Sequence, residues 1–87
     1  MNAQQKRCLD LSSTAFESVK NHLSVSDRES VHEYIYSNNE WGLGMETLVS
    51  AILETKTSVT LVQKNAIVAA MDVMGLEGSQ HEIPVVE

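Results

Sequence analysis

Residues 60–76, TLVQKNAIVAAMDVMGL, carry signals for both ends of a helix. Thr60 and Gln63 have the spacing of a capping box, in which each side chain accepts a hydrogen bond from the other residue's backbone amide. Gly75 stands where a left-handed residue commonly ends a helix, because glycine adopts a positive φ without steric cost. These signals predict a helix over residues 61–74. The apolar side chains on or near one face of this helix are Leu61, Ile67, Val68, Met71 and Met74.

Three more amphipathic segments precede this one. Apolar residues recur at helical spacing over residues 3–22, 27–37 and 41–55, which predicts a helix in each range. Ser26 and Glu29 form a second capping-box pattern, and it places the start of the middle helix at residue 27.

The helix over residues 41–55 begins with unusual residues. Gly42 and Gly44 each lower the helix propensity by about 1 kcal/mol relative to alanine. Alternatively, they let a neighbouring helix approach closely. Trp41 either packs against a neighbouring helix or anchors an interface, since aromatic residues are frequent at binding hot spots.

The pattern as a whole predicts an all-α fold. Four amphipathic helices with short polar connections indicate a compact bundle of about four short helices, formed by residues 1–76. Residues 77–87 are expected to form an irregular tail that is extended or mobile, because Gly78 and Pro84 disfavour regular structure. This tail contains apolar residues that are unusual in a free chain end, and they either dock on the bundle or pair with a partner. They are Ile83, Val85 and Val86.

The charge balance restricts the class of partner. Twelve acidic residues face six basic ones, for a net charge of −6. This balance disfavours nucleic acids and anionic membranes, because both are bound through lysine and arginine. It favours a basic protein partner, which would be attracted over long range. The simpler alternative is that the charge only keeps a small protein in solution.

No motif indicates catalysis, a cofactor or a metal. The single cysteine, Cys8, cannot form an intrachain disulfide, and the histidines show no short metal-ligand spacing. Phosphate-binding glycine loops, H-E-x-x-H and G-x-S-x-G are all absent from the sequence. His32 has Glu29 and Glu33 as carboxylate neighbours, as a general base would need, but solvated helix faces often carry such residues. We therefore expect no enzymatic activity, no cofactor and no metal.

The sequence also predicts a cytoplasmic location. Residues 1–13 lack the apolar core of a signal peptide, and no window approaches the roughly 18 apolar residues of a membrane span.

Acidic residues are concentrated in the middle of the chain. Residues 27–54 hold six acids and one base, Arg28. Glu29 and Glu33 lie one helical turn apart on a face shared with Tyr36, and like charges at this spacing cost a few tenths of a kcal/mol in an isolated helix. The stretch is either a surface that matches a basic partner or a plain solvated face.

Residues 23–76 resemble the MafI-type immunity proteins of bacteria. The most distinctive part of the resemblance is the string EWGL, within NEWGL at residues 39–43. Around it lie the capped helix that follows Leu23, the helix that contains Leu48 and Leu53, and the closing MGL at residues 74–76. The sequence departs from the family pattern at Gly44, and the tail has no aligned counterpart.

The resemblance implies a protein that binds and blocks a toxic nuclease domain. Members of this family are small cytoplasmic antitoxins against secreted polymorphic or contact-dependent inhibition toxins, several of which carry nuclease domains such as EndoU-type ribonucleases. A ribonuclease needs a basic cleft for phosphates, and an acidic helical surface matches such a cleft. We expect this chain to act as a monomer bound 1:1 to the toxin. An alternative is a small helical adaptor or regulatory subunit for a non-nuclease partner. The expected contact residues are Glu29, His32, Glu33, Tyr36, Glu40 and Glu46.

Overall fold

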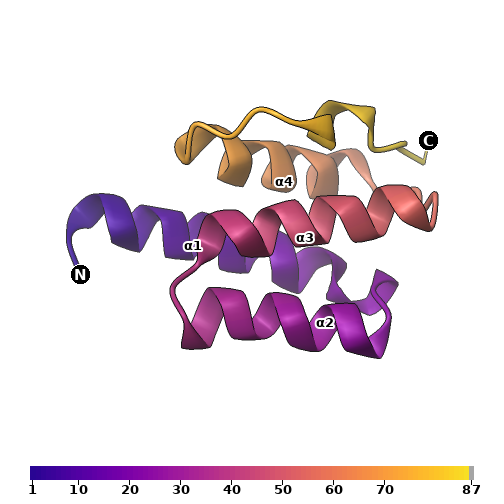
Figure 1. The fold of residues 1–87 in the computed structure, drawn as a ribbon. Coiled ribbons are helices and arrows are strands. Elements are labelled where there is room, and N and C mark those ends of the chain that lie inside the picture. Colours follow the sequence, from indigo (N-terminus) through magenta and orange to yellow (C-terminus); the bar gives the residue numbers. More distant parts are fainter. Residues whose placement is uncertain (87) are drawn as a thin grey trace.

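The chain folds into helices that run back and forth along one direction (Figure 1). In the computed structural model, which describes residues 1–86, the α-helices are α1 (Ala3–Val19), α2 (Val25–His32), α3 (Trp41–Glu54) and α4 (Leu61–Val73). Three short segments extend or follow them: the 3-10 helix η1 (Lys20–His22), the π-helix η2 (Glu33–Ser37) and the 3-10 helix η3 (Ser79–Glu82). The predicted all-α bundle of four helices is confirmed.

Helix α3 is the central element of the bundle. It packs against α1, α2, α4 and η3, whereas the most extensive helix pair is α1 with α4. Figure 1 shows that consecutive helices run in opposite directions, and that the C-terminal segment passes back over α4. The exposed side of α3 therefore lies between α2 and the turn that follows α4.

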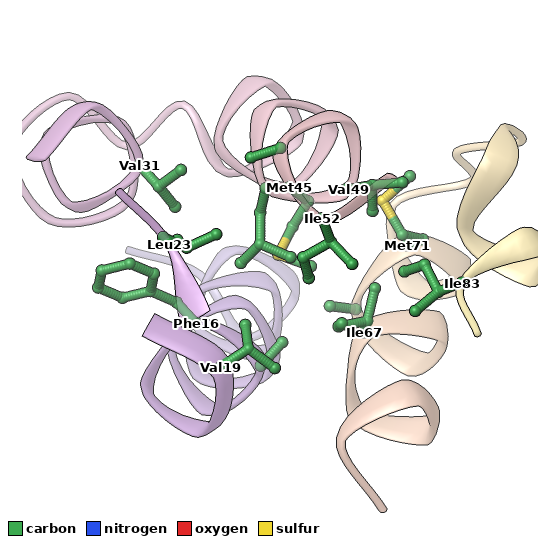
Figure 2. Packing of buried hydrophobic residues seen from close by; sticks show 14 of the residues in the cluster. Phe16, Val19, Leu23, Val31, Met45, Val49, Ile52, Ile67, Met71 and Ile83 are labelled. Carbon is green, nitrogen blue, oxygen red and sulfur yellow. The ribbon is translucent and has the colours of Figure 1, made fainter. Parts of the chain in front are cut away.

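The core is built from aliphatic side chains and a single phenylalanine (Figure 2). Phe16 and Val19 from α1 meet Met45 from α3 and Ile67 from α4, and all four are fully buried. Each such side chain contributes about 1.5–3 kcal/mol when it is removed from water. Trp41 packs, partly buried, against the same core. Of the two roles considered for Trp41, packing against the core is thus observed.

Both predicted ends of α4 are confirmed. Thr60 Oγ1 accepts a hydrogen bond from Gln63 N at 3.1 Å, and Gln63 Oε1 accepts one from Thr60 N at 2.8 Å. Gly75 has a φ of 67°, and Leu76 N donates to Met71 O at 3.0 Å. This geometry is a Schellman cap, which satisfies carbonyl groups that the end of a helix would otherwise leave free.

Helix α2 starts two residues earlier than predicted. Its N-cap is Ser24, whose Oγ accepts a hydrogen bond from Asp27 N at 3.1 Å, so the prediction of Ser26 as the cap is wrong. The pattern serine-x-x-acid occurs twice here, beginning at Ser24 and at Ser26. Leu23, directly before Ser24, is buried in the core.

The second predicted helix also changes type before it ends. Asn38 N donates to Glu33 O at 3.0 Å, which is the i to i−5 bond of a π-helix. Helix α3 approaches this segment closely at Gly44. A Cβ atom at Gly44 would lie 3.0 Å from Ile35 Cγ1 and 3.3 Å from Tyr34 Cβ. Gly44 therefore permits a close approach between helices, which is one of the two roles considered for it.

The C-terminal segment docks on the bundle, which corrects the prediction of an extended or mobile tail. Within residues 77–86, Ile83 is buried in the common core. Val85 forms a parallel β-bridge with Val59, and Val86 N donates to Val59 O at 2.8 Å. Apolar burial and backbone hydrogen bonds thus offset the entropy lost by ordering the segment. The last residue of the predicted tail lies outside the described residues.

Candidate protein-binding surface

All the residues expected to contact a partner are exposed, but they come from different elements. Four of them lie on α2 and η2, one lies in the connection before α3, and one lies on α3 itself. In chain order they are Glu29, His32, Glu33, Tyr36, Glu40 and Glu46.

Four of these residues form one surface, which we call the α2 face: Glu29, His32, Glu33 and Tyr36. Glu29, His32 and Glu33 line an open depression together with Arg28 and Ser37. Residues three or four apart lie on the same side of a helix, which explains why the depression gathers them. The structure thus brings together most of the predicted contacts.

An aromatic cluster supports the α2 face from below. The rings of His32 and Tyr36 are 4.7 Å apart, and both make edge contacts with buried Phe16, at centroid distances of 6.2 and 6.3 Å. Aromatic pairs in these geometries are favourable beyond the area that they bury. Of the α2 face, the rings of His32 and Tyr36 are therefore held in place by packing.

Glu17 of α1 adds an acidic group at the edge of this surface. Tyr36 Oη donates to Glu17 Oε2 at 3.3 Å, and Lys20 Nζ donates to Glu17 Oε1 at 2.8 Å. The hydrogen bond from Lys20 is the main reason why the pKa of Glu17 is lowered from its ordinary value. Partial burial, followed by the negative charge of Glu17, raises the pKa of Tyr36.

Glu46 lies on a separate surface, which we call the α3 strip and define by Asp27, Glu46, Ser50 and Glu54. These four residues line an open hollow at the start of α2 and along α3. Successive residues of an α-helix are about 100° apart, so Asp27 and Glu29 point to nearly opposite sides of α2. The predicted acidic face is therefore divided between two sides of this helix. Glu40, in the connection before α3, lines neither depression.

Sequence reasoning did not select Glu17, Asp27 or Glu54 as surface partners of the predicted residues. The acidic count over residues 27–54 already included Asp27 and Glu54, so the charge signal was present. Which side of α2 turns toward α3 is a tertiary feature, and it was not visible in the spacing. Glu17 comes from another helix, and no local pattern links it to Tyr36.

The charges of both surfaces are largely unbalanced. Within residues 1–86 the one ion pair is that of Lys20 with Glu17. The same part of the chain holds no cluster of three or more potential metal ligands. None of its helices combines the length and the apolar character needed to cross a bilayer.

A small apolar group lies elsewhere on the surface. Leu61 and Val62, in the first turn of α4, are 60% and 77% exposed. Val86 is also exposed, and it lies nearby because it is hydrogen bonded to Val59, shortly before α4. This group has no acidic residue among its members.

Comparison with known proteins does not assign the chain to a family: no family model, curated protein or solved structure matches it significantly.

Proposed function

We propose that this chain is an immunity protein, which binds and neutralises a cognate toxic nuclease domain. The proposal comes from the resemblance around NEWGL and is supported by the surface chemistry. The observation that carries it is the α2 face, where Glu29 and Glu33 are exposed beside a packed aromatic cluster and have no cationic partner in residues 1–86. Such a surface complements a basic protein.

The proposed inhibition is electrostatic and steric. A nuclease cleft holds phosphates with lysine and arginine, and the carboxylates of this chain would bind those same side chains. Because these residues lie on packed helices, their backbone loses little conformational freedom on binding, which favours affinity. We expect a 1:1 complex formed in the cytoplasm, with an interface of about 800 Å² per partner, and no catalysis by this chain.

The π-helix η2 gives further support to this location. It carries Glu33 and Tyr36, two of the expected contacts. π-Helical turns occur frequently at functional sites, because the extra residue redirects side chains that an α-helix would place elsewhere. The ring of Tyr36, in this segment, lies 4.7 Å from that of His32 at the end of α2.

The direct test is co-purification with the protein encoded immediately upstream of this chain. We expect a 1:1 complex and loss of the nuclease activity of the upstream protein when this chain is added. If the upstream protein is a nuclease and remains fully active with a molar excess of this chain, the proposal is wrong.

A charge-reversal variant locates the contact. The change combines Glu29→Lys, Glu33→Lys and Glu40→Lys, and it should weaken protection because the basic cleft would meet like charges. The matched control reverses three exposed acids outside both surfaces: Asp10, Asp72 and Glu82. If both triple variants lose protection to the same extent, net charge alone explains the loss, and a contact at the α2 face is contradicted.

The second candidate is an adaptor or regulatory subunit for a non-nuclease partner. It is favoured by the exposed apolar group of Leu61, Val62 and Val86, because grouped apolar residues on a surface often mark protein contacts. Under this alternative, Val62→Asp abolishes partner binding and the triple reversal of Glu29, Glu33 and Glu40 does not. Under the immunity proposal, the two results are exchanged.

A further inference from the structure

A hollow with an apolar floor and an acidic rim lies between α3 and the turn that follows α4. Two carboxylates, those of Glu46 and Glu77, are exposed at the rim. Ser50 and Ser79 add hydroxyl groups beside them. The floor consists of the side chains of Val49, Leu53, Met71 and Leu76.

The rim has charge that the chain itself does not balance. Among residues 1–86 the ion pair found is between Lys20 and Glu17, so Glu46 and Glu77 have no cationic partner there. A buried hydrogen-bond acceptor near the hollow also lacks a donor. Gln80 is buried, its Nε2 donates to Leu76 O at 3.2 Å, and its Oε1 has no hydrogen-bond partner.

The position of this acceptor relates it to the hollow. A Cβ atom on Gly78, which lines the hollow, would lie 3.3 Å from Gln80 Oε1, so this buried oxygen lies close to the hollow. A buried acceptor without a donor is unfavourable by about 1–3 kcal/mol. The rim therefore offers negative charge that no cation of residues 1–86 balances, and a buried acceptor without a donor lies close to it.

The combination of apolar floor and acidic rim fits one kind of side chain. Arginine and lysine carry a long aliphatic stem that packs on apolar surface and a cationic end that reaches polar groups. We infer that this hollow receives an arginine or lysine side chain of the basic partner, an inference that rests on the proposed function. It places a specific contact at Glu46 and Glu77, outside the α2 face.

The α3 strip continues this site along the helix. Its hollow shares Glu46 and Ser50 with the apolar-floored hollow and adds the carboxylates of Asp27 and Glu54. A basic segment that placed one side chain in the apolar-floored hollow would meet further acids next to it. The partner surface is therefore a segment with several basic residues close together.

The test uses a capped hexa-arginine peptide as probe and follows backbone amide shifts of the full chain by NMR. We expect the largest shifts at Ser50, Gly78 and Ser79. Glu46→Gln combined with Glu77→Gln should raise the dissociation constant of the probe roughly fivefold, because two exposed charge pairs are lost. The matched control, Asp10→Asn with Asp72→Asn, removes the same charge elsewhere and should change it less than about twofold.

A steric variant distinguishes binding of the probe in the hollow from non-specific electrostatic attraction to the acidic chain. Ser50→Trp fills the hollow without changing the net charge, and Ser50 is exposed, so folding should be retained. It should reduce probe binding at least as much as the double glutamine variant. Shifts centred on the α2 face, or equal effects of the double variant and its control, would overturn the inference. Because this assay contains no toxin, its outcome is independent of whether the chain neutralises a nuclease.

Discussion

The α2 face and the α3 strip are both acidic, but their side chains are held differently. On the α2 face, His32 and Tyr36 pack on buried Phe16, and Tyr36 is hydrogen bonded to Glu17. On the α3 strip, Glu46 borders a hollow with an apolar floor and has no ion pair within residues 1–86. The difference teaches that acidic residues of one small chain can be presented in two ways: beside a packed aromatic cluster, or at the rim of an open hollow with an apolar floor.

The largest expected effect comes from removing the support of the α2 face. Phe16→Ala should lower the free energy of unfolding by about 3–5 kcal/mol, because the ring is fully buried. Urea denaturation measures this loss, and NMR should show larger shift changes at His32 and Tyr36 than at Glu46 and Glu54. Leu43→Ala is the control, since Leu43 is exposed and should change stability by less than about 0.5 kcal/mol. Equal shift changes on both surfaces would contradict the supporting role of Phe16.

Two glycines of α3 sharpen the comparison at the level of backbone packing. Gly44→Val should destabilise the protein by about 1–3 kcal/mol, because a side chain there presses on Ile35 and Tyr34 beneath the α2 face. Gly42→Ala should stabilise it by up to about 1 kcal/mol, because its Cβ would meet Leu76 at an ordinary 3.7 Å. Thermal unfolding of both variants measures the difference. A stabilised Gly44→Val variant would show that η2 adapts without strain.

Neutralising one carboxylate on each surface should change stability in opposite directions. Glu17→Gln removes the ion pair with Lys20 and should cost about 0.5 kcal/mol. Glu46→Gln removes one of three carboxylates that line the same hollow, with Asp27 and Glu54, and should stabilise by a similar or smaller amount because like charges repel. Urea midpoints at pH 7 measure both effects, which should shrink at 1 M salt because of screening. If both variants change the stability in the same direction, the two surfaces do not differ electrostatically in the way described.

The smallest effects concern pH and arise at the edge of the α2 face. The pKa of Glu17 is lowered on folding, so its contribution is present above its ordinary value of 4.5 and is lost as pH falls through the lowered pKa. The pKa of Tyr36 is raised, so its contribution is present below pH 10.0 and is lost as pH rises through the raised pKa.

Tyr36→Phe tests this pair of groups. It should cost about 0.5 kcal/mol or less at pH 7, since the lost hydrogen bond is long and exposed, and it should flatten the decline in stability above pH 10.0. Urea denaturation across the pH range measures both. A decline above pH 10.0 that is as steep in the variant as in the parent would assign it to other groups.

The reliability of the sequence predictions varied along the chain according to how local the determinants are. Both ends of α4 were predicted because they depend on local features: the capping box of Thr60 with Gln63, and the positive φ of Gly75. The start of α2 was predicted two residues too late, because two equivalent cap patterns occur, at Ser24 and Ser26, and local spacing does not distinguish them. The capping box of Asn2 and Gln5 on α1 was overlooked, although its spacing was visible.

The candidate surface was predicted in part for the same reason. Helical spacing correctly placed Glu29 of α2 and Glu33 of η2 on one surface. It could not show that Glu46 belongs with Asp27, because this depends on how α2 and α3 are packed. The docking of Ile83 likewise depends on a core to which several helices contribute, and local sequence does not show it.

The π-helix has a consequence for changes in chain length. In η2 one extra residue is accommodated per turn, so deleting a single residue there would restore ordinary α-helical bonding at little cost. A deletion inside α3 would instead rotate every later side chain of that helix by about 100° and remove Ile52 from the core. Relatives of this chain that differ in length by one residue should therefore differ in η2 and keep α3 intact.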